Sequence, residues 1–280
     1  MLDHLDYSIV DVFASGPFKG NPAAVFVLQE KLSDALMQDI ATRMNLPETA
    51  FVLRREDENP LLRWFTPSFE MKLCGHATLA AGHIYLTKIL PLRSDVTFAT
   101  QYAGSLRVEK SGKLYTMDFP LQPGTSVFLE TVYPGTLTAL SNTLPVAAYQ
   151  APRDLMLVYN DAATVWSMRP DFTKLKDFSR RPIIVTAPSE NPDHDFVSRY
   201  FDAKDAITED PVTGSAHCTL APYWCQRLSK NKLKARQISA RGGELFLEIS
   251  GDRVLITGNV NDFFEGALTP GFFKPDAQPL

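Results

Sequence analysis

The segment Thr66-Pro-Ser-Phe-Glu-Met-Lys-Leu-Cys-Gly-His-Ala77 has a counterpart in the second half of the chain, Ile207-Thr-Glu-Asp-Pro-Val-Thr-Gly-Ser-Ala216. The aligned positions share one offset, Glu70 with Glu209, Gly75 with Gly214 and Ala77 with Ala216 (209 − 70 = 214 − 75 = 216 − 77 = 139). Upstream, Arg63-Trp-Phe65 matches Arg199-Tyr-Phe201, and residues 32–39 resemble residues 172–177. The shared pattern indicates two homologous halves.

Each copy contains a glycine turn, at Gly75 and at Gly214, between an apolar strand and an alanine-rich helix. The first N–H groups of a helix lack intrahelical acceptors, so such a turn can bind an anion. Two turns that face each other across a cleft would hold a small carboxylate from both sides. The alternative is that both are tight connections in which glycine supplies only a positive φ.

Bulk properties narrow the class of protein. The chain has 280 residues, which fits two domains, and its 45% hydrophobic and 21% charged residues are typical of globular proteins. The net charge of −4 and the absence of long Lys/Arg clusters argue against nucleic acid as a partner. No apolar run reaches the ~18 residues that span a membrane, and the N-terminus lacks a basic secretory segment. We therefore expect a cytoplasmic protein with no membrane partner.

The cysteines indicate neither a disulfide framework nor a metal centre. The chain has 3 cysteines, an odd number without Cys-x-x-Cys spacing. His217 and Cys218 are adjacent, so they are not spaced as ligands of one metal ion. We expect reduced thiols and no bound metal.

Hydrophobic periodicity and turn residues predict a mixed α+β protein. Strands are expected at residues 7–13, 24–28, 49–54, 62–65, 96–100, 105–110, 113–119, 155–159 and 182–187, with hairpins over 234–257. Helices are expected from the Ser33 cap to residue 45, from 77 to about 86 and from 216 to about 228. The predicted domains are residues 1–119 and 120–258, and the tail 259–280 is expected to pack on the first.

Longer motifs carry a family resemblance. They are residues 63–80, which contain the first turn, Gly20-Asn-Pro22, Leu46-Pro-Glu-Thr-Ala-Phe51 and Glu209-Asp-Pro-Val-Thr-Gly-Ser-Ala-His217. In this order, the motifs resemble the PhzF-like phenazine-biosynthesis family. The resemblance implies the diaminopimelate-epimerase-like fold, with two pseudo-symmetric domains that each wrap a mixed sheet around a central helix. It also implies proton-shift chemistry without cofactor or metal, and homodimers.

Glu48 is the candidate general base. It lies between Pro47 and an apolar strand, where partial burial would raise its pKa toward neutrality. From the residues alone, an exposed turn glutamate is the alternative. The resemblance implies the catalytic role, because Leu46-Pro-Glu-Thr-Ala50 matches the segment that bears the acid/base glutamate of the family.

Six further residues complete the expected site. His76 is expected to donate to a carboxylate or relay a proton, and Asp210 to face Glu48, with an N-cap as its structural alternative. Gly214 and Ser215 match the second anion turn of the family and are expected, with Gly75, to hold the substrate. Asn21 is a weaker candidate for substrate binding that would otherwise stabilise its own turn.

Cys74 is a secondary candidate. Diaminopimelate epimerases and proline racemases use two opposed cysteines, the first in a Cys-Gly turn. The partner position here is Thr213 (74 + 139 = 213), which cannot form a thiolate. A one-sided thiol acting with Glu48 and a buried cysteine without a role both stay open.

The sequence thus predicts a cofactor-independent isomerase that shifts a proton on a small carboxylate-bearing metabolite in the cleft between the domains. The alternatives are an epimerase or racemase that uses Cys74 with Glu48, and a non-catalytic binding or interaction module on the same fold. Tyr102, Phe119 and Tyr159 are suggested as pocket walls.

Overall fold

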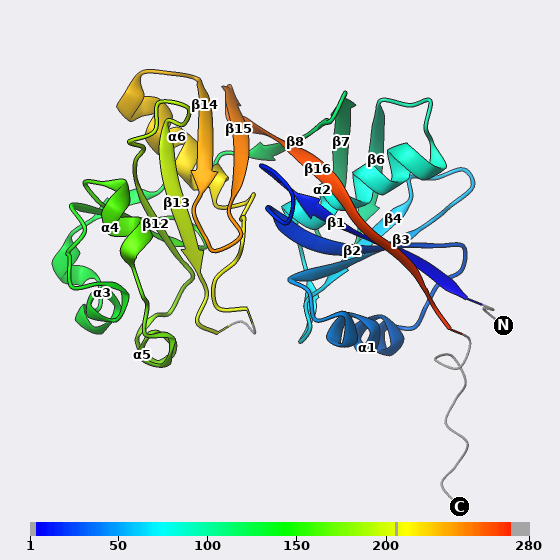
Figure 1. The fold of residues 1–280 in the computed structure, drawn as a ribbon, viewed down its shortest axis with the longest axis horizontal. Helices are drawn as coiled ribbons and strands as arrows, with labels where there is room; N and C mark the ends of the chain where they lie inside the picture. The colour runs from blue at the N-terminus through cyan, green and yellow to red at the C-terminus, as the bar shows by residue number, and fades with distance from the viewer. Residues whose placement is uncertain (1–3, 205–206, 270–280) are drawn as a thin grey trace, which may run out of the picture.

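The computed structural model describes residues 4–204 and 207–269. Figure 1 shows two lobes side by side, with the N-terminal half of the chain in one lobe and most of the C-terminal half in the other. A long strand near the end of the chain, β16, runs from the second lobe back along the first. The fold of the described residues is therefore mixed α+β, as the sequence predicts.

The strands form one continuous path through both lobes. In the first half they are β1 (Leu5–Val12), β2 (Asn21–Leu28), β3 (Glu48–Leu53), β4 (Leu61–Phe65), β5 (Glu70–Met71), β6 (Asp95–Thr100), β7 (Ser105–Ser111) and β8 (Leu114–Pro120). In the second half they are β9 (Thr125–Val127), β10 (Ala147–Gln150), β11 (Leu155–Val158), β12 (Ile183–Pro188), β13 (Phe196–Phe201), β14 (Lys232–Gln237), β15 (Gly243–Ser250) and β16 (Arg253–Leu268).

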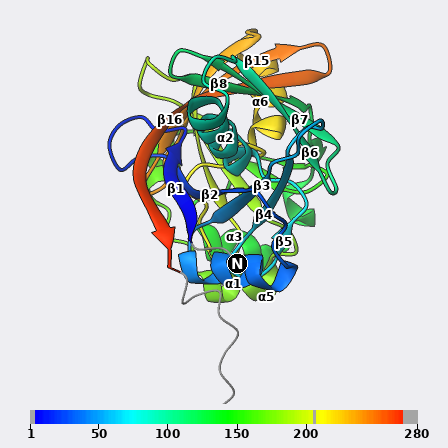
Figure 2. The same cartoon turned by 90° about the vertical axis from the view of Figure 1, so that its right-hand side faces the viewer.

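Six α-helices connect or cover the strands of the described residues. They are α1 (Asp34–Met44), α2 (Gly75–Ile84), α3 (Pro134–Leu140), α4 (Ala162–Ser167), α5 (Phe172–Phe178) and α6 (His217–Leu228), with a π-helical turn over Tyr85–Ile89 and a 3₁₀ turn over Leu129–Thr131. All residues of α2 are buried, which its apolar, alanine-rich sequence favours. Figure 2 shows α2 with strands on several sides. The buried helix carries the first glycine turn at its N-terminus.

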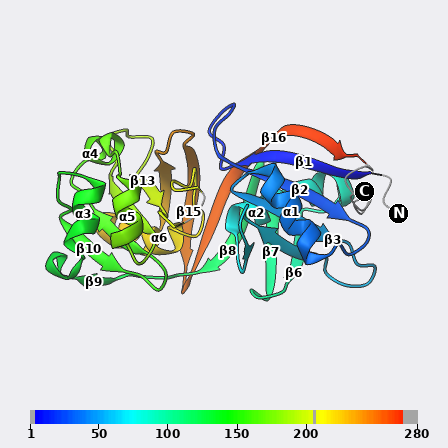
Figure 3. The same cartoon turned by 90° about the horizontal axis from the view of Figure 1, so that it is seen from below.

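The sheet closes around α2 because β16 pairs with both β8 and β1. Its first part pairs with β8, and its second part, from Val260 to Leu268, pairs with β1. The path from β1 through β2, β3, β4, β6, β7 and β8 therefore returns to its start. Figure 3 shows β16 passing from one lobe into the other, near β8. The residues after Gly258 are thus an integral strand of the first lobe as far as Leu268.

The second lobe arranges β9 to β15 near α6, which also begins at a glycine turn. Trp224 of α6 is buried and stacks on Phe196 of β13, with ring centroids 5.3 Å apart. Stacked aromatic pairs of this kind stabilise a core beyond their buried area. The second turn is therefore held between a packed helix and the sheet, as the first one is.

Two equivalent ion pairs show the internal duplication in side-chain detail. Arg63 donates from Nε and Nη2 to both carboxylate oxygens of Glu70, at 2.6 and 2.8 Å. Arg199 makes the same two bonds to Glu209, at 2.7 and 2.9 Å. Each guanidinium also lies over the ring of a phenylalanine two residues later. These forks brace the strand before each glycine turn.

Local sequence signals account for α1. Ser33 is its N-cap and accepts a hydrogen bond from the Leu36 N–H, and Asn45 ends the helix in the left-handed conformation. Both bounds agree with the prediction. The sequence patterns predicted none of α3, α4, α5, β5, β9, β10 and β13. They placed the end of the last hairpin at residue 257, eleven positions (268 − 257) before β16 ends.

The domain limits at residues 119 and 258 stay a prediction, and residues 270–280 of the expected tail lie outside the described residues. Among the helices of the described residues, none combines the length and apolar character needed to cross a membrane.

Candidate active site

Both glycine turns open onto one cavity of about 280 Å³ between the two halves, here called the cleft. Its lining includes Glu48, Cys74, Gly75 and His76 from the first half and Asp210, Thr213, Gly214 and Ser215 from the second. This volume is at the small end of the range for ligand pockets. The structure therefore brings together residues from both copies of the repeat in a space suited to a small molecule.

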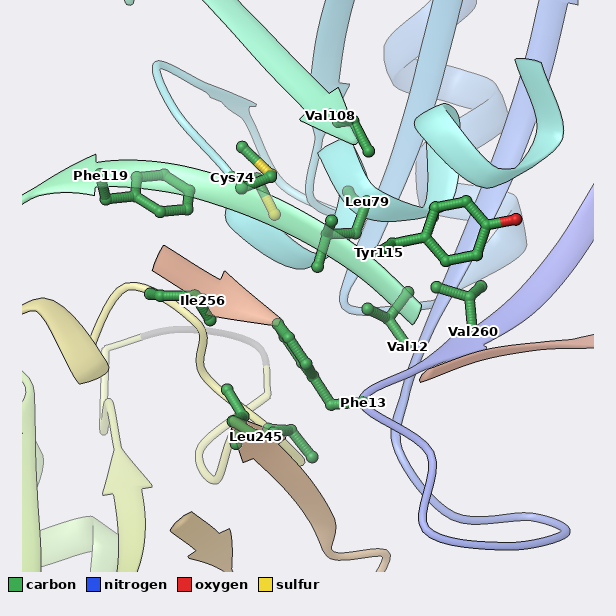
Figure 4. Close-up of a cluster of buried hydrophobic side chains, with 14 of the residues drawn as sticks. Val12, Phe13, Cys74, Leu79, Val108, Tyr115, Phe119, Leu245, Ile256 and Val260 are labelled. Carbon is green, nitrogen blue, oxygen red and sulfur yellow. The ribbon is translucent and has the colours of Figure 1, made fainter. Parts of the chain in front are cut away.

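A phenylalanine closes the back of each glycine turn. A Cβ atom added to Gly75 would lie 3.4 Å from the Phe119 ring, and one added to Gly214 would lie 3.3 Å from the Phe13 ring. Neither glycine has a positive φ. The explanation from backbone freedom is therefore wrong for this pair. A Cβ at Gly75 would make an ordinary contact with Phe119, and one at Gly214 would be slightly tight against Phe13. Figure 4 shows Phe13 and Phe119 among the buried side chains near Cys74.

Glu48 and His76 meet at the cleft wall. Glu48 is the first residue of β3, and His76 is the second residue of α2. Oε2 of Glu48 lies 3.2 Å from Nε2 of His76, with side chains 14% and 4% exposed. Burial lowers the pKa of His76 to about 3, so its imidazole is neutral at physiological pH. A neutral imidazole next to the carboxylate can relay a proton without forming a lasting ion pair.

Cys74 contacts the other nitrogen of the same imidazole. Its Sγ lies 3.6 Å from Nδ1 of His76. Burial, followed by the nearby Glu48 carboxylate, raises the pKa of the Cys74 thiol, so the sulfur keeps its proton. A thiol donates to Nδ1, which assigns the imidazole proton to Nε2, the atom that faces Glu48. The resting state of this wall is therefore a cluster of a thiol, a neutral imidazole and the Glu48 carboxyl group, with polar atoms within 4.8 Å of one another.

Asp210 is held on the opposite wall by two donors. Asn21 donates from Nδ2 to Oδ1 at 2.7 Å, and the Thr213 hydroxyl donates to Oδ2 at 2.6 Å. The same Asn21 amide nitrogen donates to the Val212 carbonyl at 2.9 Å. The N-cap of α6 is Ala216, so the N-cap explanation for Asp210 is wrong. Asp210 therefore lines the cleft with both of its carboxylate oxygens hydrogen-bonded.

Asn21 lies behind the cleft wall. It is the first residue of β2, its side chain is fully buried, and it is absent from the cleft lining. Its amide nitrogen also lies 3.2 Å from Nδ1 of His76. Asn21 therefore touches the residues of both walls, although the sequence expectation was a contact with substrate.

Arg153 is a cleft residue that sequence reasoning missed. Its Nη2 donates to the hydroxyls of Tyr200 and Ser215, both at 2.9 Å, and its Nε approaches Asp154 at 3.3 Å. Arg153 is in the loop before β11, and no motif or repeat of the sequence marks it. The Tyr200 hydroxyl completes the group by donating to Asp154 at 3.0 Å.

The suggested pocket walls were wrong. Tyr102 is 53% exposed, Tyr159 and Phe119 are buried, and none of the three lines the cleft. The apolar wall comes instead from side chains that flank the two turns, namely Phe69, Met71, Leu73, Pro182 and Ile207.

One group of side chains has the composition of a metal site. The ligand atoms of Glu48, Cys74 and His76 lie within 4.8 Å of one another. The three cysteines are free, as expected. A single nitrogen of His76 meets the 4.8 Å limit with both neighbours, so the expectation of no bound metal stays a prediction.

Comparisons with known proteins found similar sequences and similar structures. The sequence model of the family described as phenazine biosynthesis-like protein, PhzC-PhzF, matches residues 10–266. An uncharacterized isomerase of Pseudomonas aeruginosa is 44% identical, over 91% of this chain and 95% of that protein. The crystal structure of a PhzF-family phenazine biosynthesis protein from Enterococcus faecalis is 42% identical with a TM-score of 0.86, covering 95% of this chain and 99% of that one.

A protein of much lower sequence identity has a similar fold. A probable proline racemase from Agrobacterium radiobacter has a TM-score of 0.61 at 10% identity, covering 97% of this chain and 94% of that one. At that identity the match concerns the fold alone. The matches confirm the resemblance and the α+β fold that the sequence predicts.

Proposed function

Because this chain belongs to the phenazine biosynthesis-like family, PhzC-PhzF, we propose that it is an isomerase that shifts a proton on a small carboxylate-bearing metabolite. Relatives 40 to 44% identical are named isomerases, which supports the reaction class. The observation that carries the proposal is the placement of Glu48 and Asp210, from opposite halves, on one small cleft. Proton transfer between carbon atoms needs acid and base groups on such a site.

Glu48 is the proposed base. Its carboxylate takes a proton from carbon, and the electron pair of the broken C–H bond forms a new double bond to the neighbouring carbon. The π electrons of the original double bond move to its far carbon, where they form the new C–H bond with the proton that Glu48 returns. Substrate and product have the same atoms and electrons, so the step needs neither oxidant nor cofactor.

His76 and Asp210 have supporting roles in this proposal. The neutral imidazole of His76 presents its Nε2 proton beside Glu48, where it can carry a proton between the carboxyl group and substrate. Asp210, held by Asn21 and Thr213, faces the same space and serves as the second carboxyl group. The N–H groups of the Gly75 and Gly214 turns, with Ser215, hold the substrate.

The alternative with Cys74 as a base has less support. Its thiol is buried with a raised pKa, and the opposite position is Thr213. A thiolate base requires the reverse, a thiol that ionises readily. A non-catalytic binding module would not require the relay of Cys74, His76 and Glu48 beside the Asp210 carboxylate.

Proton NMR in D₂O tests the reaction class. The enzyme is incubated with a panel of carboxylate metabolites that includes amino acids and cyclohexadiene acids. We expect deuterium incorporation or double-bond migration in at least one unsaturated acid. Exchange at the α-carbon of an amino acid alone would favour epimerisation, and silence across the panel from a folded protein would favour the binding module.

We also propose a homodimer and a cytoplasmic location, on the basis of the family resemblance and the free cysteines. Light scattering after gel filtration at micromolar concentration tests the dimer, with twice the 31.2 kDa chain mass expected. A monomeric mass would contradict it. Fractionation of the source cells tests the location.

A further inference from the structure

Arg153 is the sole lysine or arginine among the described residues that line the cleft. The same lining holds three carboxylate residues, Glu48, Asp202 and Asp210. Like charges a few ångströms apart repel strongly where water is partly excluded. Among the charged side chains of the cleft, the Arg153 guanidinium is therefore the one that favours an anionic ligand.

The guanidinium is held in place but keeps donors available. Its Nη2 and Nε are engaged by Tyr200, Ser215 and Asp154. Its Nη1 makes no hydrogen bond with any described residue, and its side chain is 44% exposed. Because Ser215 accepts the bond from Arg153, its own hydroxyl proton is free to point to a ligand. Nη1 of Arg153 and the neighbouring Ser215 hydroxyl can thus both donate hydrogen bonds to a ligand in the cleft.

We propose that Arg153 is a specificity-determining residue that binds the substrate carboxylate together with the Ser215 hydroxyl. This inference rests on the proposed function and names the recognition group for its anionic substrate. A carboxylate accepts paired N–H and O–H donors at a guanidinium readily. The same cleft offers Met71, Leu73 and Ile207 to the apolar part of such a ligand, and Glu48 to its carbon atoms.

A binding experiment tests this role without turnover. Benzoate, cyclohexanecarboxylate and succinate are titrated by ligand-observed NMR, with benzamide as the uncharged counterpart of benzoate. The proteins are wild type, Arg153→Met, Arg153→Lys and Arg227→Met, the last removing an exposed charge of α6 outside the cleft. Unfolding temperatures verify that each variant is folded.

We expect Arg153→Met to weaken the binding of at least one carboxylate about ten- to a hundredfold, as for loss of a charged hydrogen bond. The affinity of Arg153→Met for benzamide should match that of wild type. The affinity of Arg227→Met for the carboxylates should also match wild type. Arg153→Lys should lie between wild type and Arg153→Met, because lysine keeps the charge but not the fork.

Three results would overturn the role of Arg153. The first is that folded Arg153→Met binds the carboxylates within twofold of wild type. The second is that Arg153→Met loses as much affinity for benzamide as for the carboxylates, and the third is that wild type binds none of the three carboxylates at about 10 mM. Because none of these depends on Glu48, failure here leaves the proposed reaction standing. Conversely, a Glu48→Gln variant that stays active would refute the reaction while leaving this binding result intact.

Discussion

Asn21 and Asp210 are 189 positions apart in the chain and joined by a hydrogen bond of 2.7 Å from Nδ2 to Oδ1. The asparagine starts a strand of the first half, and the aspartate precedes the glycine turn of the second. The bond therefore fixes a cleft carboxylate of one half from the other. The same bond explains how Asn21, which does not line the cleft, can influence the Asp210 carboxylate that does.

Replacing Asn21 by serine should lower kcat about ten- to a hundredfold, because a charge-assisted hydrogen bond to Asp210 is lost. The effect should be smaller on KM than on kcat, since Asn21 acts through Asp210. The matched test is a double-mutant cycle that combines Asn21→Ser with Asp210→Asn. If the losses of kcat, expressed as free energies, add fully in the double variant, the two residues are not coupled and the account is contradicted.

Cys74→Ser should retain activity within about threefold of wild type, because a hydroxyl can replace the thiol as donor to Nδ1 of His76. Cys74→Ala, which lacks that donor, should be the less active of the two. Steady-state kinetics of both variants provide the measurement. A thousandfold loss in Cys74→Ser would instead support the thiol as a base.

Stability should fall as the pH drops below 6.5, in part because of His76. Its folded pKa of about 3 is below the value of 6.5 for an unperturbed histidine, so the unfolded chain binds more protons between these limits. The free energy of unfolding therefore rises with pH in this window and levels off near pH 3. Between pH 7 and 5, His76 should account for a loss of about 2 kcal/mol.

Urea unfolding of wild type and His76→Asn at pH 7 and 5 measures this contribution. The variant should lose less stability on acidification. His217, whose pKa burial lowers to about 4, acts in the same direction and remains in both proteins. Equal pH dependence in the two proteins would mean that His76 is not kept neutral by the fold.

The duplicated arginine forks should matter for stability. Glu209→Gln leaves the largely buried guanidinium of Arg199 without a carboxylate, and Glu70→Gln leaves that of Arg63 with the exposed Asp34 alone, so each should lower the free energy of unfolding by about 2 to 4 kcal/mol. The exposed pair of Arg55 and Glu58 provides the control, and Glu58→Gln should change stability by less than about 0.5 kcal/mol. Similar values for all three variants would contradict the importance of burial.

Much of the fold was accessible from the sequence because its signals are local or repeated. The Ser33 cap, the apolar α2 and the two glycine turns each have a local pattern, and the 139-residue offset relates the halves. The long β16 was underestimated, because its pairing with β1 joins opposite ends of the chain. Period-2 patterns do not show which distant strand is the partner.

The site was accessible only in part. Glu48, His76, Asp210 and Ser215 belong to motifs, and the structure places all four in the cleft lining. Arg153 belongs to no motif, because its position follows from contacts with Tyr200 and Asp154 that form only in the folded protein. Asn21 was found by its motif, but only its burial reveals that it contacts Asp210.

The central claim is that Glu48 transfers the proton. The most direct measurement is solvent deuterium incorporation into the substrate found in the NMR panel, by wild type, Glu48→Gln and the exposed control Glu56→Gln. We predict that Glu48→Gln, with an unchanged circular dichroism spectrum, loses at least about a thousandfold in both turnover and incorporation, while Glu56→Gln matches wild type. Turnover and incorporation at the wild-type rate in folded Glu48→Gln would contradict the claim.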